Sequence, residues 1–250
     1  MLKAAAGNEY GNEVMALLLD QRGDDIQITE EVLKAAAGNQ SGDKVMALLL
    51  DRGGDDIQIT EEVLKVAAGN GALGYKVMSL LLDLRGDDIQ ITEEVIKAAA
   101  GNWGGYRVMA LLLDRRGDDI QITEEVLKAT AGNFFGNKVM ALLLNRRGDD
   151  VQITEEVLKA AAAGNPGYGN EVMALLLDQR GDGTQITEEV LKAAAGNQSY
   201  GCEVMTLLLD RGGDDIRITE EVLKAAAENQ HGDKVMALLG RKRKEGNSQK

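Results

Sequence analysis

The hydrophobic and polar positions of this chain follow one pattern that repeats along almost its whole length. Each unit reads ITEEVLKAAAGN, continues through a short variable piece, and ends in VMALLLDRRGDDIQ with few changes. Self-similarity at a period of 31 to 33 residues is typical of stacked helical repeats. The tetrapeptide ITEE begins at Ile28, Ile59, Ile91, Ile122, Ile153, Ile186 and Ile218.

The first half of each unit predicts a short helix. In the second unit Thr29 is a natural N-cap, and the glutamates that follow it suit the positive end of the helix dipole. Glu30 and Lys34 form an i,i+4 pair in the favourable order. Residues 35–37 are alanines, which allow a neighbouring helix to approach closely. Gly38 is placed to end this helix, which we expect to be about eight residues long.

The second half predicts a helix over 43–52, bounded by glycines. Val45, Met46 and the leucines at 48–50 leave little polar surface, so we expect this helix to be buried on several sides. The methionine recurs once per unit at the same place, which indicates a core position rather than an adaptable binding surface. In the connector DDIQI, at 24–28, the apolar alternation is too short to predict a strand, so we expect a short extended segment.

Neither helix is long enough to be stable alone, so the units must stack to bury their apolar faces. We predict an all-α solenoid of eight two-helix repeats with short extended connectors; the first repeat lacks its start and the last is altered at its end. Residues 241–250 form a basic polar tail, either a solubilising end cap or a nuclear-targeting or nucleic-acid patch. The repeats, together one domain, are 1–27, 28–58, 59–90, 91–121, 122–152, 153–185, 186–217 and 218–240.

Composition predicts a soluble intracellular protein. The single cysteine rules out an internal disulfide and suits a reducing compartment. No apolar run reaches the roughly 18 residues of a membrane span, and the N-terminus lacks the apolar region of a signal peptide. The net charge is −13 although the last ten residues are basic, so we do not expect the acidic body to bind nucleic acid. We expect a cytoplasmic protein without a membrane partner.

The residue types that carry catalysis or bind metals form no recognisable motif. The stretch at 69–74 matches G-x-G-x-x-G but follows a predicted helix instead of a strand, so it does not predict a dinucleotide site. Cys202 and His231 fall in different units without a partner acid, and the acidic pairs lack the spacing of a calcium loop. We predict no enzyme activity, no cofactor and no metal. The acidic residues form either a solvated face or a weak site for a basic partner.

The units differ most between their two helices, in the pieces EYGNE, QSGDK, GALGYK, WGGYR, FFGNK, PGYGNE, QSYGCE and QHGDK. All the aromatic residues, and the only histidine, proline and cysteine, lie in these pieces. Tyrosine, tryptophan and phenylalanine among Gly, Ser and Asn resemble the composition of a paratope. We predict a row of loops that binds a protein or peptide; the alternative is that the rings fold back and seal the ends of the helices. The predicted partner-binding residues are Tyr10, Tyr75, Trp103, Tyr106, Phe134, Phe135, Tyr168, Tyr200 and His231.

The order of residues within a unit resembles an ankyrin repeat. The Pro-Leu-His that follows the threonine in ankyrin repeats is here Glu-Glu-Val, and the long hairpin loop is shortened to GDDIQI. These departures put hairpin fingers between the repeats in doubt. The matching positions of the second unit are Thr29, Ala35, Ala36, Val45, Leu48, Leu49, Leu50, Gly54 and Asp56.

The near-identical ITEEVLKAAAGN…VMALLLDRRGDD units resemble still more closely the arrays at the C-termini of fungal NOD-like (NACHT/STAND-type) receptors. The resemblance covers about residues 1–240 and implies a ligand-sensing region; in that family a nucleotide-binding switch domain lies upstream, and this sequence contains no P-loop. The incomplete first unit indicates a fragment of a longer protein, and the alternative is a short free-standing protein. It implies a non-catalytic recognition module of fungal innate immunity or self/non-self discrimination. The alternative function is a scaffold that self-associates end to end through exposed terminal repeats.

Overall fold

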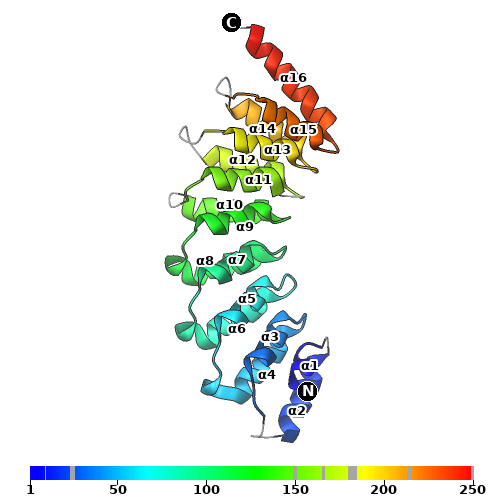
Figure 1. Cartoon of the computed structure of the whole chain (residues 1–250). Coiled ribbons are helices and arrows are strands. Elements are labelled where there is room, and N and C mark those ends of the chain that lie inside the picture. The colour runs from blue at the N-terminus through cyan, green and yellow to red at the C-terminus, as the bar shows by residue number, and fades with distance from the viewer. Residues whose placement is uncertain are drawn as a thin grey trace. The chain divides into compact units, whose positions relative to one another are not determined.

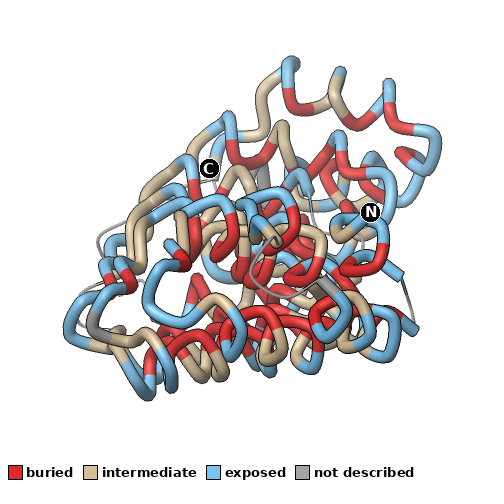
Figure 2. Tube along the Cα trace, turned by 90° about the horizontal axis from the view of Figure 1, so that it is seen from below, coloured by how far each residue is buried: buried red, intermediate tan, exposed pale blue. Residues whose placement is uncertain are grey.

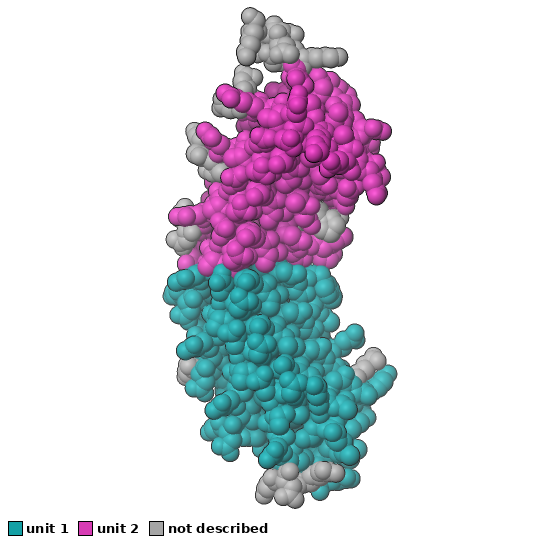
Figure 3. Space-filling view, in the orientation of Figure 1, with its two compact units in different colours: residues 1–121 teal, residues 122–250 magenta. Residues whose placement is uncertain are grey.

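Each repeat folds into two α-helices joined by a short turn. The structure is a computed structural model and describes residues 1–8, 10–22, 26–148, 151–164, 167–179, 185–212 and 216–248. The chain divides into two compact units, residues 1–121 and 122–250, at a point where the sequence predicts a boundary between repeats (Figure 3). None of the described residues lies in a β-strand.

A first and a second helix alternate from repeat to repeat (Figure 1). The first helices are α1 (Leu2–Ala6), α3 (Glu30–Gly38), α5 (Glu61–Gly69), α7 (Glu93–Ala100), α9 (Glu124–Gly132), α11 (Glu155–Gly164), α13 (Glu188–Gly196) and α15 (Glu220–Glu228). The second helices are α2 (Gly11–Arg22), α4 (Gly42–Gly53), α6 (Gly74–Arg85), α8 (Gly105–Arg116), α10 (Gly136–Arg147), α12 (Gly169–Gln179), α14 (Gly201–Gly212) and α16 (Gly232–Ser248). Short 3₁₀ helices follow three of the second helices, at η2 (Gly54–Asp56), η3 (Gly86–Asp88) and η4 (Gly117–Asp119).

The first helices begin at the predicted threonine cap. In α5 the Thr60 hydroxyl oxygen accepts a hydrogen bond from the Val63 amide at 3.4 Å, which satisfies one of the free donors of the first turn. The end of the helix differs slightly from the prediction. In α3 Gly38 is the last helical residue, and the chain leaves the helix at Asn39, where φ is −78° and ψ is 149°. An extended asparagine, rather than a left-handed glycine, therefore ends this helix.

Alanine allows the first helices to pack closely against one another. Ala36 and Ala37 are fully buried in α3, and Val32 and Leu33 complete its buried face. Within residues 1–121 the first helices α1, α3, α5 and α7 stack in one layer and the second helices in another. The helices α9 to α16 form the same two layers within residues 122–250. The predicted all-α solenoid of eight two-helix repeats is confirmed.

The second helices are less enclosed than the sequence suggested. Val45, Met46, Leu49 and Leu50 are buried, but Leu48 is only half-buried. One side of each second helix therefore remains at the surface, and Figure 2 shows exposed turns and connectors around the buried segments. The methionines are core residues as predicted, except that Met236 in α16 is 36% exposed. The fully buried ones are Met15, Met46, Met78, Met109, Met140, Met173 and Met205.

A glycine starts each second helix because that helix touches the end of the first. A Cβ atom at Gly42 would overlap the carbonyl oxygen of Ala36, and one at Gly105 would overlap that of Ala99. No L-residue larger than glycine fits at this crossing without moving the backbone. The glycine therefore sets the distance between the two helices of a repeat.

The charged residues of the first helices link neighbouring repeats. The Lys34 ammonium lies 2.9 Å from Glu31 and 3.7 Å from the predicted i,i+4 partner Glu30, so the nearer carboxylate is the i,i+3 one. The first glutamate of a repeat instead accepts a hydrogen bond from the threonine of the next repeat. Thr154 donates its hydroxyl hydrogen to Glu124 at 2.7 Å. The same bond across repeats joins Thr187 to Glu155 and Thr219 to Glu188, at 2.7 Å and 2.9 Å.

The connectors between repeats are extended, and the C-terminal segment continues the last helix. Ile57, Ile89 and Ile120 are buried in extended segments that follow the 3₁₀ helices, as the short alternation of apolar residues predicted. The helix α16 continues past Gly240 to Ser248, so the basic segment begins as helix rather than as a separate tail. The reason is that Arg-Lys-Arg-Lys-Glu, all good helix formers, stands where other repeats have Asp-Arg-Arg-Gly-Asp, so a lysine replaces the glycine after the second helix.

Candidate functional site

An asparagine, buried in five of the described repeats, holds the turn between the two helices of a repeat. Asn39 is only 6% exposed, and its side-chain nitrogen donates to the carbonyl oxygens of Ala6 at 2.7 Å and Asn8 at 2.6 Å in the preceding repeat. Its side-chain oxygen accepts the amide hydrogen of Ser41 at 3.0 Å. One side chain therefore joins two repeats and fixes the start of its own turn.

The same bonds recur in both compact units. Asn70 donates to Ala37 at 2.9 Å and Asn39 at 3.0 Å, and Asn229 donates to Ala195 and Asn197, both at 2.8 Å. Sequence reasoning missed this role and treated Gly-Asn only as the boundary of a helix. The available signal was that the asparagine is present in all eight repeats although an exposed turn position tolerates other residues.

The side-chain oxygen of this asparagine accepts hydrogen bonds in turns of different length. In the repeats with one extra residue it accepts two amide hydrogens: Asn70 from Ala72 and Leu73, and Asn197 from Ser199 and Tyr200. The turn thus keeps its anchor while its tip changes; we call it the Asn-anchored turn. In the other described cases the accepted amide is that of Tyr10, Ser41, Gly104, Phe135 or His231.

None of the nine predicted partner-binding residues is buried. Tyr10 is 71% exposed, Trp103 63%, Phe134 46% and Tyr106 45%, and His231 is also exposed. The other four, Tyr75, Phe135, Tyr168 and Tyr200, are half-buried. Tyr75 and Tyr106 were predicted in loops but lie in the first turn of α6 and α8, because these helices begin at the preceding glycine. Pro166 lies outside the described residues.

Residues 1–121 bring aromatic and basic side chains together on one surface. The Arg107 guanidinium carbon lies 5.1 Å from the centre of the Tyr75 ring, which is within the range of a cation–π contact. The Trp103 ring rests directly on Gly71, where a Cβ atom would overlap its indole nitrogen. We call Tyr75, Lys76, Trp103, Tyr106 and Arg107 the basic-aromatic surface.

Residues 122–250 contain a cluster made of rings alone. The centroids of Phe134 and Phe135 are 4.9 Å apart with an edge-to-face geometry, and Tyr168 lies 6.1 Å and 5.9 Å from them. The ring of Phe134 also packs on Gly167, where a Cβ atom would lie 2.8 Å from its Cδ1. Rings from two successive repeats therefore meet; we call Phe134, Phe135 and Tyr168 the aromatic cluster.

Electrostatics distinguishes the two surfaces. The third residue of the second helix is Lys44, Lys76 or Arg107 in three successive repeats of residues 1–121. At the same position α12 and α14 carry Glu171 and Glu203, whereas α10 and α16 carry lysine and α2 carries glutamate. Asn137 in α10 donates a hydrogen bond to Glu171 at 2.6 Å, so the acidic side chain is tied to the repeat before it.

Most of the clear pKa shifts lie along the exposed row of glutamates and lysines on the first helices; in addition, the hydrogen bond from Arg115 lowers the pKa of Asp83 in α6. Hydrogen bonds from Lys3 and Lys34 lower the pKa of Glu31 to about 2. The Lys192 ammonium likewise lowers the pKa of Glu189, and Glu189 raises the pKa of Lys192. These groups are ion pairs at the surface and stabilise the charged forms of both partners.

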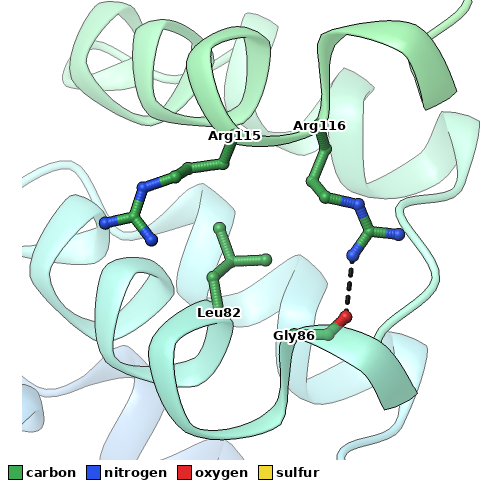
Figure 4. A pocket seen from close by; sticks show the side chains of 4 residues that line it. All are labelled: Leu82, Gly86, Arg115 and Arg116. Atoms are coloured by element: carbon green, nitrogen blue, oxygen red, sulfur yellow. Dashed lines mark hydrogen bonds between the residues drawn. The ribbon is translucent and has the colours of Figure 1, made fainter.

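A hollow of about 330 Å³ between α6 and α8 contains two arginines (Figure 4). Arg116 donates to the carbonyl oxygen of Gly86 at 2.8 Å and to the Asp119 carboxylate at 2.7 Å. Arg115 pairs with Asp83 at 2.7 Å. Because both guanidinium groups already have partners, the hollow acts as a joint between repeats and not as an anion site.

Cys202 and His231 line one hollow of about 270 Å³ although they belong to different repeats. Their separation in sequence had suggested that they would not meet. Cys202 is half-buried and His231 exposed, and no hydrogen bond joins them within the described part of the chain. In that part no group of three metal-binding side chains is found either. The hollow therefore presents two potentially reactive groups without the contact that activates a thiol.

None of the helices in the described ranges is long and apolar enough to cross a membrane.

None of the curated proteins searched matches the chain. A repeat family described as a domain of unknown function, DUF7104, matches residues 1–15, 17–46, 48–78, 80–109, 111–140, 142–173, 175–205 and 207–236. From the second match on, each begins within a second helix, half a repeat out of phase with the units read from ITEE, but the matches give the same number of repeats. The chain belongs to the DUF7104 family.

Proposed function

We propose that the chain is a non-catalytic recognition module that binds a protein or peptide through its Asn-anchored turns. The supporting observation is a constant anchor that carries variable tips. The buried asparagine and the glycine that begins the second helix recur from repeat to repeat, whereas the residues between them range from Gln-Ser to Phe-Phe. A frame that keeps its backbone while its tips differ presents different side chains in one fixed geometry.

Preorganisation supports this function. The turn backbone is held by hydrogen bonds from buried side chains, so little conformational entropy is lost when a partner binds. Aromatic side chains add contact area with few rotatable bonds, and they are enriched among the residues that dominate binding energy. The exposed rings of Trp103 and Phe134 have this character.

We place the module in the cytoplasm as the sensor region of a fungal NOD-like receptor, in line with the resemblance of its units to those arrays. The partner is a protein or peptide rather than nucleic acid, because the net charge of −13 repels a phosphate backbone. No catalysis, cofactor or metal is part of this function.

The test is selection of a random-peptide phage library on the full chain and on a variant with Trp103, Tyr106, Phe134 and Phe135 all changed to serine. We expect the native chain to enrich peptides that the serine variant fails to bind. The matched control changes Leu17 and Leu84 to serine; these residues are 60% and 55% exposed but lie outside the turns. Peptides that bind the serine variant as well as the native chain would contradict the proposed function.

A second candidate function is end-to-end self-association. It is favoured by exposed apolar residues in the first helical pair, where Met1 is 79% exposed, Leu17 60% and Val14 45%. An apolar patch on a repeat is a ready surface for another copy. Sedimentation equilibrium of the native chain and of a variant with Val14 and Leu17 changed to aspartate tests it. Assemblies that persist in the variant, or a native chain that stays monomeric, would rule it out.

A further inference from the structure

An open groove runs over the second helices α4, α6 and α8 of residues 1–121. Its volume is about 520 Å³, within the range of ligand sites. Ala47 and the half-buried Leu80 and Leu111 give it an apolar floor, and the half-buried Tyr75 lies beside them. These leucines belong to the side of the second helices that the solenoid leaves uncovered.

Departures from the repeat pattern converge on this groove. Tyr75 stands where most repeats have Asn, Asp or Cys, and Ser79 stands where six of the eight repeats have alanine. The leucine at the position of Leu80 and Leu111 is shared by all repeats, so the groove combines a common apolar floor with a serine found in one repeat and a tyrosine found in two. The same repeat carries an extra residue in its Asn-anchored turn, which ends at Gly74.

Unpaired positive charge surrounds the groove. Among the described residues, Lys44 in the lining and Arg107 beside it, over the Tyr75 ring, have no carboxylate partner within ion-pair distance. Lys76 pairs with Asp43 at the long distance of 3.8 Å. The other carboxylate of the lining, Asp83, is already held by Arg115 at 2.7 Å. Counted together with Arg107 and Arg115, which lie beside the lining, four cations face the two carboxylates Asp43 and Asp83, on a chain whose net charge is −13.

We propose that this groove binds a short acidic peptide segment. A leucine, isoleucine or phenylalanine of the peptide packs on Ala47, Leu80 and Leu111. Flanking carboxylates of the peptide pair with Lys44 and Arg107, which have no carboxylate partner among the described residues, and with Lys76, whose own partner Asp43 lies at 3.8 Å. Binding at this groove presupposes the recognition function proposed above and adds the chemistry of its partner.

The floor of the groove favours a peptide over nucleic acid. Affinity for nucleic acid comes from many phosphate contacts at once, and the acidic remainder of the chain repels a long polyanion. An aliphatic floor between cations instead fits a compact apolar side chain with acidic neighbours. A single-stranded oligonucleotide serves as the competing occupant in the test.

The test uses a random-peptide library selected on the full chain, with affinities measured by fluorescence anisotropy. We expect enriched peptides to carry Asp or Glu around a large apolar residue. Changing both Lys44 and Arg107 to glutamate should weaken binding at least about tenfold, because two attractions become repulsions. The matched control, Lys138→Glu with Lys234→Glu, changes the same helix position in residues 122–250 and should leave affinity within about twofold.

The outcomes distinguish failure of the groove as the binding site from failure of the recognition function. Peptides that lose binding only when Phe134 and Phe135 are changed would overturn the groove but leave the recognition function standing. Peptides that ignore the charge reversal and all the loop aromatic residues would overturn both. Binding of a twenty-nucleotide oligothymidine that is lost in the Lys44/Arg107 variant would replace the acidic peptide as occupant and so refute it. Folding of every variant is checked by its circular dichroism and unfolding midpoint.

Discussion

The basic-aromatic surface and the aromatic cluster are built on the same frame but offer different chemistry. In residues 1–121 Trp103 packs on Gly71, and the exposed Arg107 lies 5.1 Å from the centre of the Tyr75 ring, so this surface combines rings with positive charge. In residues 122–250 Phe134, Phe135 and Tyr168 touch one another and leave an uncharged ring surface. Because the Asn-anchored turn is common to both, a few substitutions at its tip suffice to change what a repeat can bind.

The largest effect should come from breaking the frame that the two surfaces share. Gly105→Ala places a methyl group against the carbonyl oxygen of Ala99, and we expect a loss of about 2–3 kcal/mol in the free energy of unfolding. Urea unfolding followed by Trp103 fluorescence measures it. Gly201→Ala should cost less, because its Cβ would lie 2.7 Å from Ala194, a milder overlap.

Gly69→Ala is the control for this experiment, since nothing lies within 4 Å of the added methyl group and the residue is helical. It should leave stability unchanged or raise it by roughly 0.5–1 kcal/mol. Equal destabilisation at Gly69 and Gly105 would show that close contact between the helices is not what requires glycine.

Removing the anchor of one turn should have the next largest effect. Asn102→Ala deletes the bonds to the Ala68 carbonyl and the Gly104 amide, both 3.1 Å, and leaves buried partners unsatisfied. We expect a loss of about 2 kcal/mol. Hydrogen exchange locates the effect, because the Gly104 amide should exchange faster while those of Ser199 and Tyr200 do not.

The reciprocal variant, Asn197→Ala, should expose the Ser199 and Tyr200 amides and leave Gly104 protected. The half-exposed Asn12 in α2 provides a control in which the same substitution should change little. If Asn102→Ala accelerated exchange equally in both compact units, the turns would not be independent supports for their surfaces.

Removing a single ring should have a smaller effect on stability, and the effect should differ between the two surfaces. Phe135 is half-buried and contacts two other rings, so Phe135→Ser should cost about 1–2 kcal/mol. Tyr106 is 45% exposed, and Tyr106→Ser should stay within about 0.5 kcal/mol. Thermal unfolding of both variants measures the difference. An equal loss of stability in the two variants would show that contacts between the rings do not stabilise the aromatic cluster.

The frame was largely predictable because its signals are local. Helix periodicity, the threonine cap and the terminal glycines lie within a few residues of the elements that they define, so both helices were found to within one or two residues. The alanines and methionines were correctly assigned to the core for the same reason. Local order also predicted extended connectors, as Ile57 and Ile89 confirm.

The rest depends on contacts between repeats, which a single unit does not reveal. Asn39 looks like an ordinary turn residue until the carbonyl groups of Ala6 and Asn8 are seen beside it. The groove requires three second helices to lie side by side and leave Leu80 and Leu111 uncovered. Whether the rings were exposed was likewise undecided, since Gly-rich turns can either display a ring or close over it.

The smallest effect is the loss of stability at low pH, which should differ between two equivalent glutamates, one in each compact unit. Two lysines, Lys3 and Lys34, donate to Glu31, whereas Lys192 is the main partner of Glu189. Both glutamates have a lowered pKa in the folded state, so their contribution to stability is present above the ordinary value of 4.5 and is lost as pH falls below it. The paired lysines have a raised pKa, so their contribution is lost only as pH rises past 10.5.

Glu31→Gln should therefore flatten the loss of stability between pH 4.5 and about 2 more than Glu189→Gln does. Both changes should be small, because the carboxylates are exposed and water and salt screen their ion pairs. Urea midpoints measured across this pH range, at low and at high salt, test the order. A larger effect at Glu189, or an effect of Glu31→Gln that high salt does not reduce, would show that the second lysine does not strengthen the pair.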